Sequence, residues 1–176
     1  MLLADTLSGT YKLVLVLHIL AAIIGFGAVM LNALYAAQAR GRRGAEGLAI
    51  SQANFLVSSV AQYFIYAVFV LGILLVLLSD DAWGFDQFWI WGSMGLYVIG
   101  LSLSHGVLQP NVRRLIALQE QMVHGGSPPA GAAGGGLPPQ LAEMEQRGKR
   151  VGMTAAALDV VLVLILFLMV WKPGLN

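Results

Sequence analysis

Residues 11–37 read YKLVLVLHILAAIIGFGAVMLNALYAA, and the one Lys, Arg, Asp or Glu among them is Lys12. A helix needs about 20 mostly apolar residues to cross the roughly 30 Å hydrocarbon core of a bilayer. Three further runs, residues 55–78, 88–108 and 151–171, reach that length. The sequence therefore predicts an all-α protein with four transmembrane helices.

The composition of the whole chain favours the same class. Hydrophobic residues make up 58% of the 176 residues and charged residues 11%, and the mean hydropathy is +0.77. A soluble domain of this length could not hide so much apolar surface in one core. Four spans leave too little sequence for a second folded module, so we expect a single membrane domain over residues 1–176. The net charge of +1 argues against a nucleic-acid partner.

The positions of the basic residues predict the orientation. Eight of the ten Lys and Arg residues lie in the first and third connections between spans, and Lys12 and Lys172 lie on the opposite side. The positive-inside rule then places both termini outside and the basic connections in the cytoplasm, as in a bacterial inner membrane. Short connections favour an antiparallel up-down-up-down bundle. The aromatic belt expected at the outer interface comprises Tyr11, Trp83, Trp89, Trp91 and Trp171.

The third connection has three parts. Residues 111–123 keep apolar side chains at helical spacing, which predicts that the third span continues as a helix past Pro110 into the cytoplasm. Residues 124–139 form a Gly/Pro/Ala-rich segment typical of a flexible linker. Residues 140–150 are expected to lead back as a charged helix into the fourth span.

His18 is the first ionisable residue inside a span. It begins a stripe of small and polar residues that should face protein, and that stripe comprises His18, Ala22, Gly25, Val29, Asn32 and Ala36. A neutral imidazole beside small residues suits axial ligation of a haem, with Ala22 and Gly25 leaving room for the macrocycle. A hydrogen bond to a neighbouring helix is the alternative. Copper or zinc held by His18 with a carboxylate or Asn32 is a further one, without a supporting H-x-x-H spacing.

His105 and Asp159 are the other two ionisable residues within spans. Both are expected in the cytoplasmic half, where antiparallel third and fourth helices could bring them together as a buried polar pair. The alternative is that Asp159 stays protonated and bonds Ser102, Ser104 or a backbone carbonyl. The sequence leaves these two open.

Residues 11–27 around His18, and residues 109–115 (QPNVRRL), resemble a bacterial family of predicted integral membrane proteins of unknown function whose members have four spans. At the first helix the chain is also similar to the CopD copper-resistance family and the HemJ-type protoporphyrinogen oxidases. In the HemJ-type enzymes the first-span histidine is a haem b ligand, so the resemblance implies that role for His18. Their later-span lysine has no counterpart in the third or fourth span here.

Three classes of function are consistent with these features. The first is a haem b-binding redox protein that uses His18. The second is a non-catalytic accessory subunit of a respiratory or photosynthetic membrane complex, or a homo-oligomer. The third, with the least support, is a metal or small-solute transporter. The chain carries no phosphate loop, nucleophile elbow or H-E-x-x-H helix, and whether it is an enzyme is left open.

Overall fold

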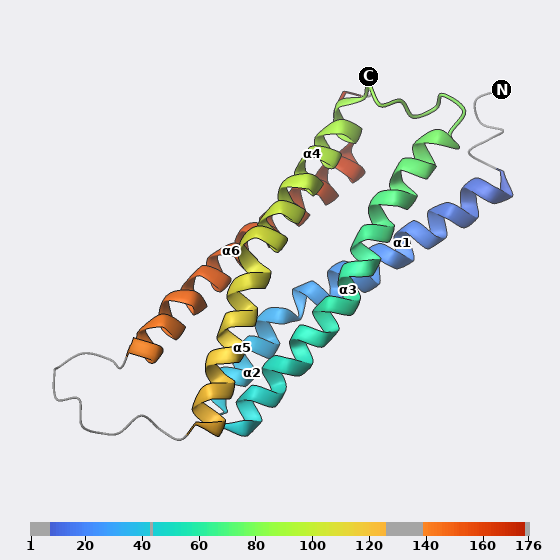
Figure 1. The fold of residues 1–176 in the computed structure, drawn as a ribbon. Coiled ribbons are helices and arrows are strands. Elements are labelled where there is room, and N and C mark those ends of the chain that lie inside the picture. The colour runs from blue at the N-terminus through green and yellow to red at the C-terminus, as the bar shows by residue number, and fades with distance from the viewer. Residues whose placement is uncertain (1–7, 43, 126–138, 175–176) are drawn as a thin grey trace. The chain divides into compact units, whose positions relative to one another are not determined.

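A computed structural model describes residues 8–42, 44–125 and 139–174 of the chain. Within these ranges the chain is helical and contains no strand, which confirms the all-α prediction (Figure 1). The helices are α1 (Gly9–Met30), α2 (Asn32–Gly41), α3 (Ala45–Leu77), α4 (Phe88–Leu103), the π-helix η1 (Ser104–Leu108), α5 (Gln109–His124) and α6 (Pro139–Trp171).

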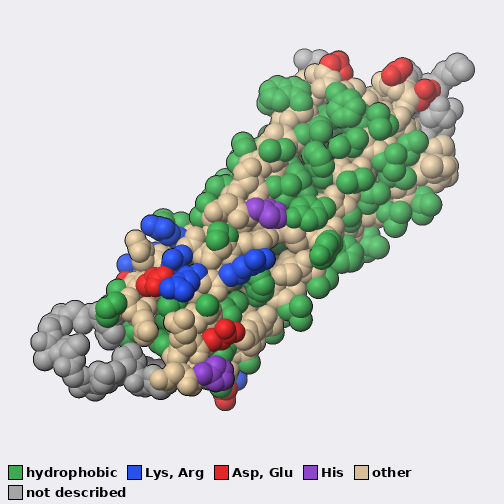
Figure 2. Space-filling model, in the orientation of Figure 1, with side chains coloured by type: hydrophobic (Ala, Val, Ile, Leu, Met, Phe, Trp, Pro, Cys, Tyr) green, Lys and Arg blue, Asp and Glu red, His purple; other side chains and the backbone are tan. Residues whose placement is uncertain are grey.

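Within the described ranges, three helical stretches are long and apolar enough to cross a membrane: Gly9–Gly41, Ala45–Leu77 and Pro139–Trp171. Large apolar side chains lie exposed on them, such as Ile23 at 66% and Val163 at 63%. Apolar side chains cover much of the visible face in Figure 2. These exposed side chains are suited to contact lipid.

Several helix boundaries differ from the predicted spans. The first predicted span is interrupted at Leu31, where α1 gives way to α2. α3 begins ten residues before the predicted span, at Ala45. The predicted helical continuations past Pro110 and before residue 151 are confirmed by α5 and α6. Most of the predicted linker, residues 126–138, lies outside the described residues.

The described chain divides into two compact units. The first unit comprises Met1–Leu31, Val57–Ile99 and Val161–Asn176, and the second comprises Asn32–Leu56 and Gly100–Val160. Helices α3, α4 and α6 each contribute residues to both units. The contacts inside each unit are described separately below.

The first unit depends on a close contact between α1 and α3. A Cβ atom added to Gly25 of α1 would lie 3.0 Å from Ile65 Cγ1 and 3.1 Å from Ile65 N of α3. Tyr97 of α4 donates a 2.6 Å hydrogen bond to the carbonyl oxygen of the same Ile65. Its ring stacks on Phe69 with centroids 4.8 Å apart. Helices in lipid associate through such close backbone approach and interhelical hydrogen bonds.

One end of the first unit is closed by an aromatic cluster. Trp83 Nε1 donates to the hydroxyl oxygen of Tyr11 at 3.2 Å, and the rings of Trp83 and Trp89 meet edge to face at 5.5 Å. Lys172 Nζ lies 4.0 Å from the centre of the Trp83 ring. The start of α1, the α3–α4 connection and the end of α6 therefore meet at the same end of this unit (Figure 1).

In the second unit, Pro110 accounts for the π-helix that precedes it. Proline has no N–H to donate to the carbonyl four residues earlier and its ring crowds that turn, so the helix must adjust locally. The adjustment is visible where the N–H of Gln109 donates to the carbonyl oxygen of Ser104, five residues back. The Asn111 side chain, which is buried, then donates a 2.7 Å hydrogen bond to the carbonyl oxygen of Val107.

The contact at Gly25 can be tested by a valine substitution. Gly25→Val should destabilise the chain by about 1–3 kcal/mol, because the added atoms overlap the α3 backbone at Ile65. Gly27→Val is the matched control on the same helix, since a Cβ there meets nothing within 4 Å. Its effect should stay within about 0.5 kcal/mol. Unfolding of the full chain in mixed detergent micelles, followed by circular dichroism, measures both; equal losses would contradict the role of Gly25.

Candidate functional site

His18 lies on α1 in the first unit and packs against α3 at Gly72. A Cβ atom added to Gly72 would lie 3.2 Å from Cε1 of the His18 ring and 3.7 Å from its Nδ1. Any side chain larger than hydrogen at position 72 would press on the imidazole. The ring therefore has space against α3 because residue 72 is glycine.

The Nδ1 atom of His18 is buried and has no hydrogen-bond partner among the described residues. The backbone of Val68, one turn before Gly72, is the polar group of α3 that the ring approaches. An imidazole nitrogen buried without a hydrogen bond costs about 1–3 kcal/mol. Because Nδ1 is the nitrogen enclosed at the contact with α3, Nε2 is the nitrogen left for another partner.

The register that joins Gly25 to Ile65 also joins His18 to Gly72. His18 lies seven residues before Gly25 on α1, and Gly72 lies seven residues after Ile65 on α3, as two antiparallel helices require. Gly72 was not singled out from the sequence. It could have been found by pairing the first two predicted spans as antiparallel helices that make a close contact at Gly25.

The other residues of the predicted stripe have different surroundings. Gly25 is buried, and the backbone of α3 at Phe64 and Ile65 fills the space in which the sequence predicted room for a macrocycle. Ala22, one turn after His18, stays partly exposed. Asn32 belongs to the second unit and starts α2. The expectation of open space beside Gly25 is therefore wrong for this conformation.

His105 and Asp159 both belong to the second unit and both are exposed. His105 lies in the π-helix η1, where its Nδ1 is 3.0 Å from the carbonyl oxygen of Leu101. Asp159 makes no hydrogen bond or ion pair with any residue in the described ranges. The structure thus places neither side chain in a buried position, and their pairing stays a prediction.

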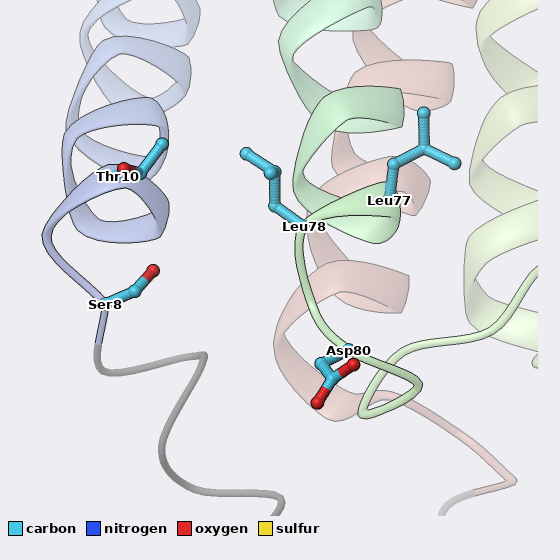
Figure 3. A pocket seen from close by; sticks show the side chains of 5 residues that line it. All are labelled: Ser8, Thr10, Leu77, Leu78 and Asp80. Atoms are coloured by element: carbon cyan, nitrogen blue, oxygen red, sulfur yellow. The ribbon is translucent and has the colours of Figure 1, made fainter.

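No group of three or more His, Cys, Asp or Glu side chains gathers around a common centre in the part of the chain that the structure describes. A depression between the start of α1 and the end of α3 is lined by Ser8, Thr10, Leu77, Leu78 and Asp80 (Figure 3). It is open to the surroundings, and none of the predicted site residues lines it. His18 and its contact with Gly72 are therefore the best-defined candidate site.

Comparison with known proteins places the chain in a family. Searches among curated proteins and among solved structures found no match. A family model described as "Predicted integral membrane protein (DUF2269)" matches residues 12–173, which cover the candidate membrane-spanning stretches of the described chain apart from residues 9–11. The chain therefore belongs to the DUF2269 family of predicted integral membrane proteins.

Proposed function

We propose that this integral membrane protein binds haem b through His18. The observation that carries the proposal is the His18 ring itself, with its Nδ1 atom buried without a hydrogen bond against Gly72 inside a membrane-spanning helix. Ionisable side chains within spans are rare and usually functional. The resemblance of the first span to the HemJ-type oxidases, which stays an expectation from the sequence, implies the same role.

The side-chain chemistry of His18 fits a haem ligand. A ligating histidine presents one nitrogen to the metal, and its other nitrogen usually faces a backbone carbonyl or carboxylate that fixes the ring. The ring approaches the α3 backbone at Val68, and its Nδ1 lies on the side of Gly72. Nε2 would then be the ligand atom, and bound haem b would supply one-electron transfer.

The surroundings of His18 restrict where a macrocycle could lie. The Gly25 side of α1 is closed by α3, so the room predicted there does not exist in this conformation. Ala22 is the partly exposed small residue nearest along the helix, one turn from His18. Apolar side chains such as Leu15 and Ile19 flank the histidine in sequence and would keep water from the ligand.

We further propose that the chain crosses the membrane four times. The helical backbone from Phe88 through η1 to Leu108 has 21 residues, enough at about 1.5 Å per residue to cover roughly 30 Å. The basic connections would then face the cytoplasm and both termini the outside, in a bacterial inner membrane.

An assembly role, as an accessory subunit or homo-oligomer, is the second candidate. Its support is Asp159, an exposed carboxyl group without a partner among the described residues and within the apolar part of α6. Gly148 and Gly152, four residues apart, precede Asp159 on α6. A Cβ atom added to either glycine would meet nothing within 4 Å. A carboxyl group next to a small-residue face favours contact with another membrane helix over contact with lipid.

Haem binding is tested by the absorption spectrum of the full chain, purified in mild detergent after expression with excess haem. Wild type should show a Soret band, and His18→Ala should lose it. His105→Ala and His124→Ala are matched controls that should keep the band. Gly72→Val should shift or weaken it, because the added methyl groups press on the ring. A colourless wild type, or a band that survives His18→Ala, would exclude the proposal.

The fourth crossing is tested by cysteine labelling, since the chain contains no native cysteine. Asp86→Cys places an exposed thiol just before α4, and Gln121→Cys places one in the last turn of α5, beyond the proposed span. A membrane-impermeant maleimide should label Asp86→Cys in intact cells and Gln121→Cys only after permeabilisation. Labelling of both from the same side would show that α4 does not cross.

The assembly role is tested by native electrophoresis of membranes solubilised in mild detergent. Wild type should migrate above the monomer, and both Asp159→Ala and Gly152→Leu should shift it toward the monomer. Gly95→Leu on α4 is the control, because position 95 is equally open. A monomer in wild type, or the same loss in Gly95→Leu, would count against this role.

A further inference from the structure

The second unit contains a cluster of arginine side chains that its carboxylates do not neutralise. Glu143 of α6 receives Arg147 Nε at 2.8 Å and Arg114 Nε of α5 at 3.1 Å. Two guanidinium groups therefore share one carboxylate. Arg150 follows Arg147 by three residues on α6, which places it on the same side of the helix.

The contacts of these arginines leave donors available. Arg147 Nη1 donates to Asn111 Oδ1 at 3.0 Å, and Arg114 Nη2 lies 3.5 Å from Glu143 Oε2. Arg147 Nη2 and Arg114 Nη1 have no hydrogen bond among the described residues. Arg150 is exposed and makes no ion pair there. The cluster thus combines three positive charges with one negative charge and keeps unused N–H groups.

The buried Asn111 side chain holds the centre of this cluster in place. Its amide nitrogen donates to the carbonyl oxygen of Val107, so its oxygen is directed to Arg147. Arg147 is about two-thirds buried, with a side-chain exposure of 30%, whereas Arg114 is 47% exposed. Arg147 is therefore pre-organised, and the more exposed Arg114 and Arg150 are accessible to a ligand.

The cluster lies at the level where α6 enters the apolar part of its span. Val151, the next residue after Arg150, begins an apolar run that ends at Trp171. A group bound at Arg147 and Arg150 would be at headgroup level, with apolar helix surface continuing from it. Figure 2 shows Lys and Arg side chains gathered with acidic ones on the visible face, next to apolar side chains.

We propose that Arg114, Arg147 and Arg150 form a binding site for the phosphate of an anionic phospholipid, with the acyl chains along the apolar part of α6. Arginine pairs with phosphate through parallel N–H···O bonds. Basic pockets beside transmembrane helices are a common way to hold anionic headgroups. The carboxylate of Glu143 orients two of the arginines and offsets one of their charges.

The experiment measures the thermal stability and the lipid adducts of the full chain in neutral detergent as dioleoyl-phosphatidylglycerol is added. Phosphatidylglycerol should raise the melting temperature of wild type and appear as a bound lipid in native mass spectrometry. Zwitterionic phosphatidylcholine and inorganic phosphate serve as the two comparison probes. Neither should raise the melting temperature or appear as a bound adduct. Equal effects of phosphatidylcholine or of inorganic phosphate would overturn the proposal of an anionic lipid.

Variants then separate binding from folding. Arg150→Gln, whose side chain has no ion pair in the described chain, should weaken phosphatidylglycerol binding by about fivefold, and Arg150→Lys should lose less. Lys149→Gln, which removes a charge already paired with Glu145 at 2.7 Å, is the matched control and should bind as wild type.

Glu143→Gln gives the sharpest test, because it should bind phosphatidylglycerol more tightly than wild type. The substitution removes the one negative charge of the cluster and frees two guanidinium groups, whereas a purely structural role for Glu143 would weaken binding. Weaker binding by Glu143→Gln, or unchanged binding by Arg150→Gln, would overturn the proposal. Native mass spectrometry reports binding even if a variant melts at a lower temperature.

Discussion

The close approach of α1 and α3 is the constraint on which the first unit depends. In lipid, apolar side chains gain little by leaving one hydrocarbon environment for another, so helices need close backbone contact and hydrogen bonds to associate. Gly25 allows α1 to contact the α3 backbone at Ile65, and the same register brings His18 against Gly72. Tyr97 binds the carbonyl oxygen of Ile65 from α4. One stretch of α3 thus positions α1, α4 and the His18 side chain.

Polar side-chain contacts join the helices of the second unit. Pro110 forces a local π-helix, and Asn111 uses that region to reach both Val107 and Arg147. α3 joins α5 through Gln52 and Glu120, at 2.8 Å. Polar contacts of this kind are effective where helices leave the apolar core and carry charged residues. They also gather Arg114 and Arg147 around Glu143, just before the apolar run of α6, which is the basis of the proposed lipid site.

The two proposed sites differ in what the surrounding structure does for them. His18 lies between apolar residues, and its Nδ1 atom is buried against α3 without a hydrogen bond among the described residues, so Nε2 is the nitrogen that a haem iron would take. In the arginine cluster, Arg114 and Arg147 are already hydrogen-bonded to Glu143, and the cluster carries more positive than negative charge. A haem ligand and a headgroup site would thus serve different purposes, one chemical and one anchoring.

The sequence by itself determined the all-α class, the apolar runs, and the helical continuations past Pro110 and before Val151, because hydrophobic length and helical periodicity are local properties. It also singled out His18 as a candidate ligand, which stays a prediction, whereas Gly72 was not found and open space beside Gly25 was wrongly expected. Only the tertiary structure decided which glycine admits a neighbouring helix and which leaves a face open, since Gly25 and Gly27 are alike in sequence and differ in what α3 places beside them. The sharing of the Glu143 carboxylate by Arg114 and Arg147 likewise depends on contact between α5 and α6. Arg114 and Glu143 are far apart in sequence, and no local pattern sets the register between their helices.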